Sequence, residues 1–220
     1  MKIFYIISNK RYSGKTYLSS HLIASLLNLN KKVCYYKPFV MDIIDNKLFD
    51  IDYIKNITNL NASDIFVSYA TNGNISPLHS IDIQIDERDI IDLIDENKEI
   101  YEYMVLESLC LYEPIKENYN FMDLIFDIEK YNQVYMIPIL EYDSNIIHSS
   151  LEQVELFHTR GFKISFIVIN IKNDIIISYD VLNYIRKQID PIKIYIINYM
   201  SEKNKINYIK YPDIIKELNI

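Results

Sequence analysis

The sequence predicts an α/β protein in which helices flank a mainly parallel central sheet. Two observations carry this prediction. Short apolar segments alternate along the chain with longer amphipathic segments, a pattern typical of parallel strands joined by helices. The first apolar segment is followed by a Gly-Lys-Thr triplet and a helical pattern, which is the order strand, phosphate-binding loop, helix. The length of 220 residues fits one domain spanning residues 1–220.

Each expected element in the first half of the chain has a local signal. Leucines recur at helical spacing after the triplet, and Pro38 stops the second strand. Asp86 begins an acidic segment with isoleucines on one side, which predicts a cover helix. The expected strands are residues 3–7, 33–36 and 101–107, and residues 65–69 are expected to form a strand or an extended stretch. The expected helices run from the triplet to residue 29, over residues 50–57 with Asp50 and Asp52 in an acidic first turn, and over residues 86–97.

The second half continues the alternation. Gly161 follows a long amphipathic segment and supplies the left-handed residue that commonly ends a helix. The expected strands are residues 134–139, 164–169 and 192–197, and the expected helices are residues 121–131, 144–160, 177–188 and 212–218.

The stretch from Ser8 to Thr16 has the residue types of a phosphate-binding loop. Unpaired amides at a helix start face an anion, Lys15 adds a positive charge, and the Thr16 hydroxyl can hold Mg²⁺. The usual loop begins with glycine six or seven residues before the lysine, where this chain has Asn9 and Ser8. The pattern predicts a P-loop NTPase-like fold. The candidate nucleotide-binding residues in this segment are Ser13, Gly14, Lys15, Thr16 and Tyr17.

Two further charged residues end expected strands. Lys37 follows the second strand, and Glu107 ends the buried-type strand 101–107. Ligands of a parallel sheet sit beyond the carboxyl ends of its strands, so we expect Lys37 to point toward the same crevice as Lys15. A P-loop protein often keeps an acid facing Mg²⁺ where Glu107 stands.

The formal net charge of −7 argues against a nucleic-acid partner held by phosphate contacts, which requires clustered cations. No apolar run approaches the roughly 18 to 20 residues needed to cross a bilayer, and the N-terminus resembles neither a signal peptide nor a transit peptide. We therefore expect a soluble, cytoplasmic protein without a membrane partner.

These motifs together resemble the dethiobiotin synthetase family, the ATP-dependent carboxylases of biotin synthesis. The resemblance rests on Gly14-Lys15-Thr16, on Tyr36-Lys37-Pro38, and on Glu107 at the end of a buried strand. It extends over nearly the whole chain, mostly through spacing and hydrophobicity, and includes these further positions: Asp52 at the head of a helix, Ser76-Pro77, Pro114, Asp123 and Asn170.

The resemblance implies ATP and Mg²⁺ as cofactors. Lys15 would hold the ATP phosphates, and Asn170 would lie near the adenine. The implied magnesium ligands are Thr16, Asp52 and Glu107. The implied catalytic residues are Lys37 and Lys15. Lys37 would stabilise the carbamate and the transferring phosphoryl group. Such enzymes join CO2 to an amine of 7,8-diaminopelargonate, phosphorylate the carbamate and close a cyclic urea. The family also implies a homodimer, because it builds its substrate site across a two-fold interface.

The chain departs from the family pattern in its loops. Lys10-Arg11-Tyr12 replaces a threonine-rich, acid-bearing stretch, and Ser108 to Leu111 replaces a glycine-rich segment. Two alternatives follow: a degenerate P-loop protein that binds nucleotide without turnover, or a related ATP-dependent amidoligase with another substrate. Lys10 also stands where partition and septum-placing ATPases carry a lysine, but those proteins end strand two with aspartate, where this chain has Lys37-Pro38.

Overall fold

We describe the protein from a computed structural model, which places all residues except 42, 44–47, 72–75, 80–83, 173–177 and 200–220. Contacts within the chain divide it into two compact units. Unit 1 comprises Met1–Arg11 and Lys15–Val134, and unit 2 comprises Tyr12–Gly14 and the chain from Tyr135 onward. The phosphate-binding loop therefore contributes residues to both units.

Unit 1 contains four parallel strands in the order β1 (Lys2–Ile7), β6 (Tyr103–Glu107), β2 (Val33–Tyr36) and β4 (Ile65–Phe66). Residues of β1 and β6 are almost all buried, which explains their unbroken apolar runs. Ile6 pairs with Glu107, and Leu106 pairs with Tyr36. The register therefore brings the carboxyl ends of β1, β6 and β2 to one edge.

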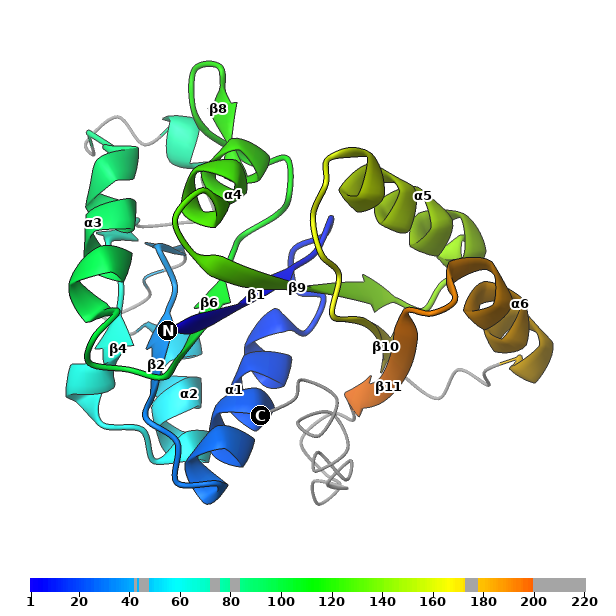
Figure 1. Cartoon of the computed structure of the whole chain (residues 1–220), viewed down its shortest axis with the longest axis horizontal. Coiled ribbons are helices and arrows are strands. Elements are labelled where there is room, and N and C mark those ends of the chain that lie inside the picture. The colour runs from blue at the N-terminus through cyan, green and yellow to red at the C-terminus, as the bar shows by residue number, and fades with distance from the viewer. Residues whose placement is uncertain (42, 44–47, 72–75, 80–83, 173–177, 200–220) are drawn as a thin grey trace. The chain divides into compact units, whose positions relative to one another are not determined.

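The helices of unit 1 lie on both sides of these strands. In Figure 1, α1 (Lys15–Asn28) and α2 (Phe49–Thr58) lie below the strands, and α4 (Phe121–Glu129) lies above them. α3 (Glu87–Asn97) packs beside α4. Capping fixes two of the helix starts. Asp86 accepts a hydrogen bond from Arg88 N, and Asn120 forms a capping box with Asp123.

Short elements complete unit 1. They are the 3-10 turns η1 (Ala62–Asp64) and η2 (Pro77–His79), the paired strands β3 (Phe39–Val40) and β5 (Tyr69–Ala70), and the hairpin strands β7 (Pro114–Lys116) and β8 (Tyr119–Asn120).

Unit 2 contains three parallel strands, β9 (Gln133–Glu141), β10 (Phe166–Lys172) and β11 (Lys193–Tyr199). Its helices are α5 (Ile146–Thr159) and α6 (Tyr179–Ile189), which pack against each other. Isoleucines of β10 and the apolar side of α6 share one buried cluster, whose members include Ile167, Ile169, Leu182 and Ile185. Burial of this apolar surface stabilises the unit.

The structure confirms the predicted fold class and most of the predicted elements. Gly161 has a φ of 81°, as expected of the residue that ends α5. α2 begins at Phe49, and Asp50 and Asp52 both lie in its first turn, as expected. The expected strand or extended stretch 65–69 is divided between β4 and β5, and the hairpin β7–β8 is additional. The expected helix 212–218 lies outside the described residues.

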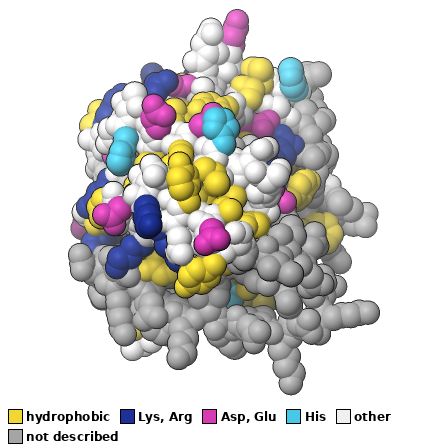
Figure 2. Space-filling view, turned by 90° about the vertical axis from the view of Figure 1, so that its right-hand side faces the viewer, with side chains coloured by type: hydrophobic (Ala, Val, Ile, Leu, Met, Phe, Trp, Pro, Cys, Tyr) yellow, Lys and Arg dark blue, Asp and Glu magenta, His cyan; other side chains and the backbone are white. Residues whose placement is uncertain are grey.

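Within the described ranges, every helix is too short or too polar to cross a membrane. On the face drawn in Figure 2, charged side chains of both signs are interspersed with hydrophobic ones.

Candidate functional site

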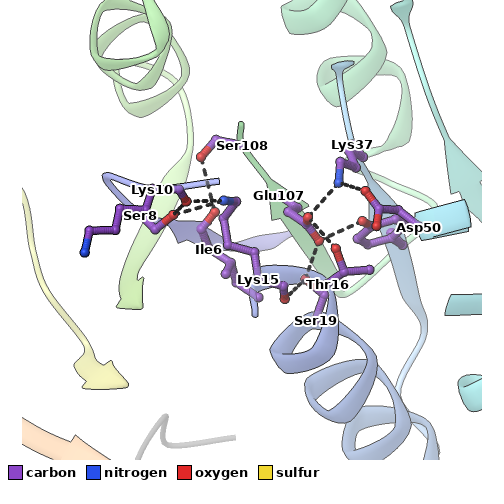
Figure 3. Close-up of polar contacts among 11 residues, drawn as sticks. Ile6, Ser8, Lys10, Lys15, Thr16, Ser19, Lys37, Asp50, Glu107 and Ser108 are labelled. Carbon is purple, nitrogen blue, oxygen red and sulfur yellow. Dashed lines mark hydrogen bonds and ion pairs between the residues drawn. The ribbon is translucent and has the colours of Figure 1, made fainter. Parts of the chain in front are cut away.

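Two residues that follow β1 in unit 1, Ser8 and Lys10, bond the ammonium group of Lys15. Lys15 Nζ donates hydrogen bonds to Ser8 Oγ at 2.9 Å and to the Lys10 carbonyl oxygen at 3.1 Å (Figure 3). The Ser8 hydroxyl in turn donates to the Lys10 carbonyl at 2.6 Å. Ser8 stands where the usual loop has glycine. In this chain the Ser8 hydroxyl accepts a hydrogen bond from Lys15 and helps to fix the position of its ammonium group.

Burial lowers the pKa of Lys15 to about 8, although Glu107 opposes this shift. A buried ammonium without a full counter-charge is well matched to an anionic ligand, because phosphate oxygens can replace lost hydration. The environment of Lys15 therefore favours anion binding.

Gly14 is required for two reasons, both within unit 2. Its φ is 97°, a conformation that residues with a Cβ rarely adopt. A Cβ at this position would also lie 2.5 Å from Asn170 Nδ2. Asn170, fully buried in β10, donates from Nδ2 to the Ser13 carbonyl oxygen at 2.7 Å. Asn170 thus holds the loop backbone, and its Oδ1 has no hydrogen-bond partner among the described residues.

Tyr17 lies in the first turn of α1, where its ring meets His21 edge to face with centroids 4.4 Å apart. The structure therefore places Tyr17 against its own helix.

Glu107 is the centre of the polar contacts in unit 1. It is 1% exposed and accepts four hydrogen bonds from side chains. Thr16 Oγ1 and Lys37 Nζ each donate to Oε1 at 2.8 Å. Ser19 Oγ donates to Oε2 at 2.9 Å, and Tyr35 OH donates to the same oxygen at 2.8 Å. Four donors explain how a carboxylate is tolerated at the end of a buried strand.

Lys37 connects Glu107 to α2. Its ammonium group bonds Glu107 on one side and Asp50 on the other (Figure 3). Burial alone would lower the pKa of Lys37, but the two neighbouring carboxylates outweigh it and raise that pKa. Lys37 is therefore held as a cation, and within unit 1 it bonds the same Glu107 oxygen as Thr16 does.

The oxygen atoms gathered here suit Mg²⁺, which is usually bound by one or two carboxylates together with phosphates of a substrate. Thr16, Glu107 and Asp50 supply a hydroxyl and two carboxylates. No group of three or more His, Cys, Asp or Glu side chains with metal-binding geometry occurs in the part of the chain that the structure describes. The donor set therefore fits a Mg²⁺ that is completed by a ligand's own oxygens.

The structure brings Asp50 into this cluster, and it leaves Asp52 outside the side-chain contacts described. Both residues lie in the first turn of α2, where successive side chains point in different directions. The sequence alone offered two acids in one turn and no means of choosing the one that faces Lys37.

Sequence reasoning also missed three contributors. Ser19 and Tyr35 look like ordinary residues of a helix and a buried strand, yet both hold Glu107. Arg11 pairs with Glu113 at 2.8 Å and so ties the phosphate-binding loop to the segment after β6. Helical spacing from Thr16 could have indicated Ser19, because residues three apart share a helix face.

A parallel α/β fold with a lysine-bearing loop between its first strand and first helix defines a P-loop NTPase-like protein. The chain belongs to the AAA domain family, whose sequence pattern matches residues 2–209. No curated protein sequence matches the chain significantly.

Solved structures support the same fold. The MinC:MinD cell division protein complex of Aquifex aeolicus matches with a TM-score of 0.56 at 15% identity, over 92% of this chain and 83% of that chain. A ParA family ATPase from Chlorobium tepidum TLS matches with a TM-score of 0.52 at 11% identity, over 91% and 84%. The septum site-determining protein MinD of Pyrococcus horikoshii OT3, complexed with Mg-ADP, matches with a TM-score of 0.55 at 13% identity, over 90% and 82%. At such identities the likeness concerns the fold.

Proposed function

We propose that this protein binds ATP together with Mg²⁺ at the cluster formed by Lys15, Thr16, Lys37, Asp50 and Glu107. The observation that carries the proposal is the convergence on Glu107 Oε1, which accepts from both the loop hydroxyl of Thr16 and the ammonium of Lys37. This convergence supports a role for Glu107 as a metal ligand next to the first turn of α1. Lys15 would hold phosphate oxygens, and Thr16, Asp50 and Glu107 would hold the metal.

We further propose an ATP-dependent ligase reaction similar to that of dethiobiotin synthetase. In that reaction an amine of 7,8-diaminopelargonate adds to CO2, the carbamate is phosphorylated, and the second amine closes a cyclic urea with release of phosphate. Negative charge builds on carbamate and phosphoryl oxygens, and bound Mg²⁺ would neutralise part of it. Lys15 and Lys37 are cations that can stabilise the rest, which supports a phosphoryl-transfer role.

The test of the reaction is an assay of ATP consumption with 7,8-diaminopelargonate and bicarbonate, with the cyclic product measured by mass spectrometry. We expect product in proportion to ATP used, and none from the Lys37→Ala variant. If nucleotide binds but no product forms, the protein is not this ligase.

A second candidate is a nucleotide-binding module without turnover. It is favoured by the segment after Glu107, where Leu109 and Leu111 are buried. The dethiobiotin synthetase family has glycines in this segment that let a substrate approach the backbone. The ion pair Arg11–Glu113 also joins the segment before Tyr12 to the segment after Glu107. A related ligase acting on another acid or amine is the remaining alternative. The same ATP-consumption assay with other acids and amines would separate this ligase from a nucleotide-binding module, because only the ligase would consume ATP.

We also propose that the protein is a homodimer, as the resemblance implies. Sedimentation at high protein concentration tests this, and a monomer would count against a substrate site shared between subunits.

A further inference from the structure

The ammonium group of Lys37 lies on oxygens that we assign to Mg²⁺. It bonds Glu107 Oε1 at 2.8 Å and Asp50 Oδ2, while Thr16 Oγ1 bonds the same Glu107 oxygen at 2.8 Å. All three candidate metal ligands are thus either bonded to Lys37 or one hydrogen bond away from it. Lys37 and a metal ion would compete for the same electron pairs.

The two oxygens of Glu107 have different surroundings. Oε2 accepts from Ser19 and from Tyr35, whose side chains are buried in α1 and β2. Oε1 accepts from Thr16 and Lys37, and Lys37 is also bonded to a half-exposed Asp50 side chain. Hydrogen bonds to Oε2 fix the carboxylate in place, so an exchange at Oε1 would not require Glu107 to move.

The balance of charges favours replacement of the Lys37 ammonium group by Mg²⁺ at these carboxylates. The two carboxylates carry two negative charges, and among the nearby cations that the structure describes Lys37 alone bonds them directly, while Lys15 interacts with both through space. Removing Lys37 without a replacement would leave the buried carboxylate of Glu107 without a directly bonded cation, which proteins tolerate poorly. Mg²⁺ carries two positive charges and would compensate both carboxylates.

We propose that Lys37 is the internal counter-ion of this metal site, and that Mg²⁺ displaces its ammonium group from Glu107 and Asp50. Entry of the metal then frees Lys37 to contact the anionic groups of a bound substrate. The protein would therefore bind the metal weakly without nucleotide and couple metal entry to the availability of Lys37. This inference rests on the proposed metal site and adds how that site is controlled.

The test measures binding of Mn²⁺, used as a spectroscopic substitute for Mg²⁺, to nucleotide-free protein by electron paramagnetic resonance. The key variant is Lys37→Met, which keeps a long side chain and removes the charge. We expect this variant to bind Mn²⁺ more tightly than the wild type, on the order of tenfold or more, because the competing cation is gone. Equal affinity in the two proteins would overturn the proposal.

A matched control is Lys130→Met, which removes the lysine of an exposed pair with Asp127 at 2.7 Å. Its Mn²⁺ affinity should equal that of the wild type. Lys37→Gln serves if the methionine variant does not fold, since it removes the charge but keeps hydrogen-bond donors. The double variant Lys37→Met/Glu107→Gln removes one carboxylate charge as well and should lose the gain in Mn²⁺ affinity.

Thermal unfolding supplies a second readout. We expect Mg²⁺ to raise the melting temperature of Lys37→Met clearly more than that of the wild type, since a ligand stabilises the state that binds it. A wild type stabilised by Mg²⁺ as strongly as the variant would contradict the competition. Binding of a Mg-ATP analogue to the wild type is measured in parallel. If that binding fails, the proposed nucleotide function is wrong. If it succeeds while the two Mn²⁺ affinities are equal, only the exchange of Lys37 is wrong.

Discussion

Thr16, in the first turn of α1, donates its hydroxyl hydrogen to Glu107, the last residue of β6, over 2.8 Å. The two residues are 91 positions apart in the sequence, and this bond joins the phosphate-binding loop to the proposed metal-binding acid. Because Glu107 also accepts from Lys37, one carboxylate couples the parts of the site that β1, β2 and β6 bring together.

Tyr35→Phe should weaken binding of Mg²⁺ by about tenfold, as is usual when a residue that orients a metal ligand is removed. The variant deletes one of the two donors that hold Glu107 Oε2 and changes little else in β2. Tyr36→Phe is the control, because Tyr36 bonds Ser68 and not Glu107. Measurement of Mg²⁺ affinity by calorimetry in the presence of an ATP analogue tests this. Equal losses in both variants would mean that Tyr35 acts only on stability.

Asp50→Asn should reduce the gain in nucleotide affinity that Mg²⁺ provides, whereas Asp52→Asn should leave that gain unchanged. Asp50 bonds Lys37, whereas Asp52 shares its helical turn and has no side-chain bond to the cluster among the residues that the structure describes. The two variants remove the same charge from the same turn, so they differ only in position. Titrations with and without Mg²⁺ give the comparison, and a larger effect from Asp52→Asn would restore the ligand that the family resemblance implied.

Gly14→Ala should impair nucleotide binding, because the added Cβ would lie 2.5 Å from Asn170 Nδ2 in a backbone with a φ of 97°. About 1.4 kcal/mol of strain in the loop would cost tenfold in affinity. Gly161→Ala is the matched control: its φ is 81°, but a Cβ there would meet nothing within 4 Å. That variant should lose about 1 kcal/mol of stability and keep its affinity. Wild-type affinity in Gly14→Ala would show that the Asn170 side chain can move away from the added Cβ without disturbing the loop.

His21 should make the stability of the protein depend on pH. Burial in α1 lowers its pKa from 6.5 to about 4. The unfolded chain therefore binds more protons between these values, and the free energy of unfolding should fall as the pH falls from 6.5 to 4, by up to about 3 kcal/mol from this residue. Urea unfolding of the wild type and His21→Gln over this range tests it. His148→Gln, at a residue whose side chain is 78% exposed, is the control. Parallel pH profiles for the wild type and His21→Gln would exclude the effect.

The fold could be predicted because its signals are local. The apolar run of β1, the triplet that opens α1 and Gly161 after α5 are each visible in a few adjacent residues. The hairpin β7–β8 was not predicted, since its strands are very short and Asn118, with a φ of 60°, forms the turn in place of glycine. The division of the phosphate-binding loop between two units has no local signal at all.

The part of the candidate site that could be predicted is the pair of residues at the ends of parallel strands. Lys37 and Glu107 follow or end parallel strands, and the shared edge of a parallel sheet brings such residues together. The roles of Ser19 and Tyr35 depend on which way a hydroxyl points inside a packed core, and sequence spacing does not give that direction. The same limit explains why Asp52 was chosen where Asp50 makes the contact.

The measurement that tests the central claim most directly is isothermal titration of the protein with a non-hydrolysable ATP analogue, with Mg²⁺ and with EDTA, for the wild type and Lys15→Ala. We predict saturable binding by the wild type that weakens in EDTA, and loss of binding in Lys15→Ala while its circular dichroism stays unchanged. Absence of binding by the wild type, or unchanged affinity in Lys15→Ala, would contradict the assignment of this loop as a nucleotide site.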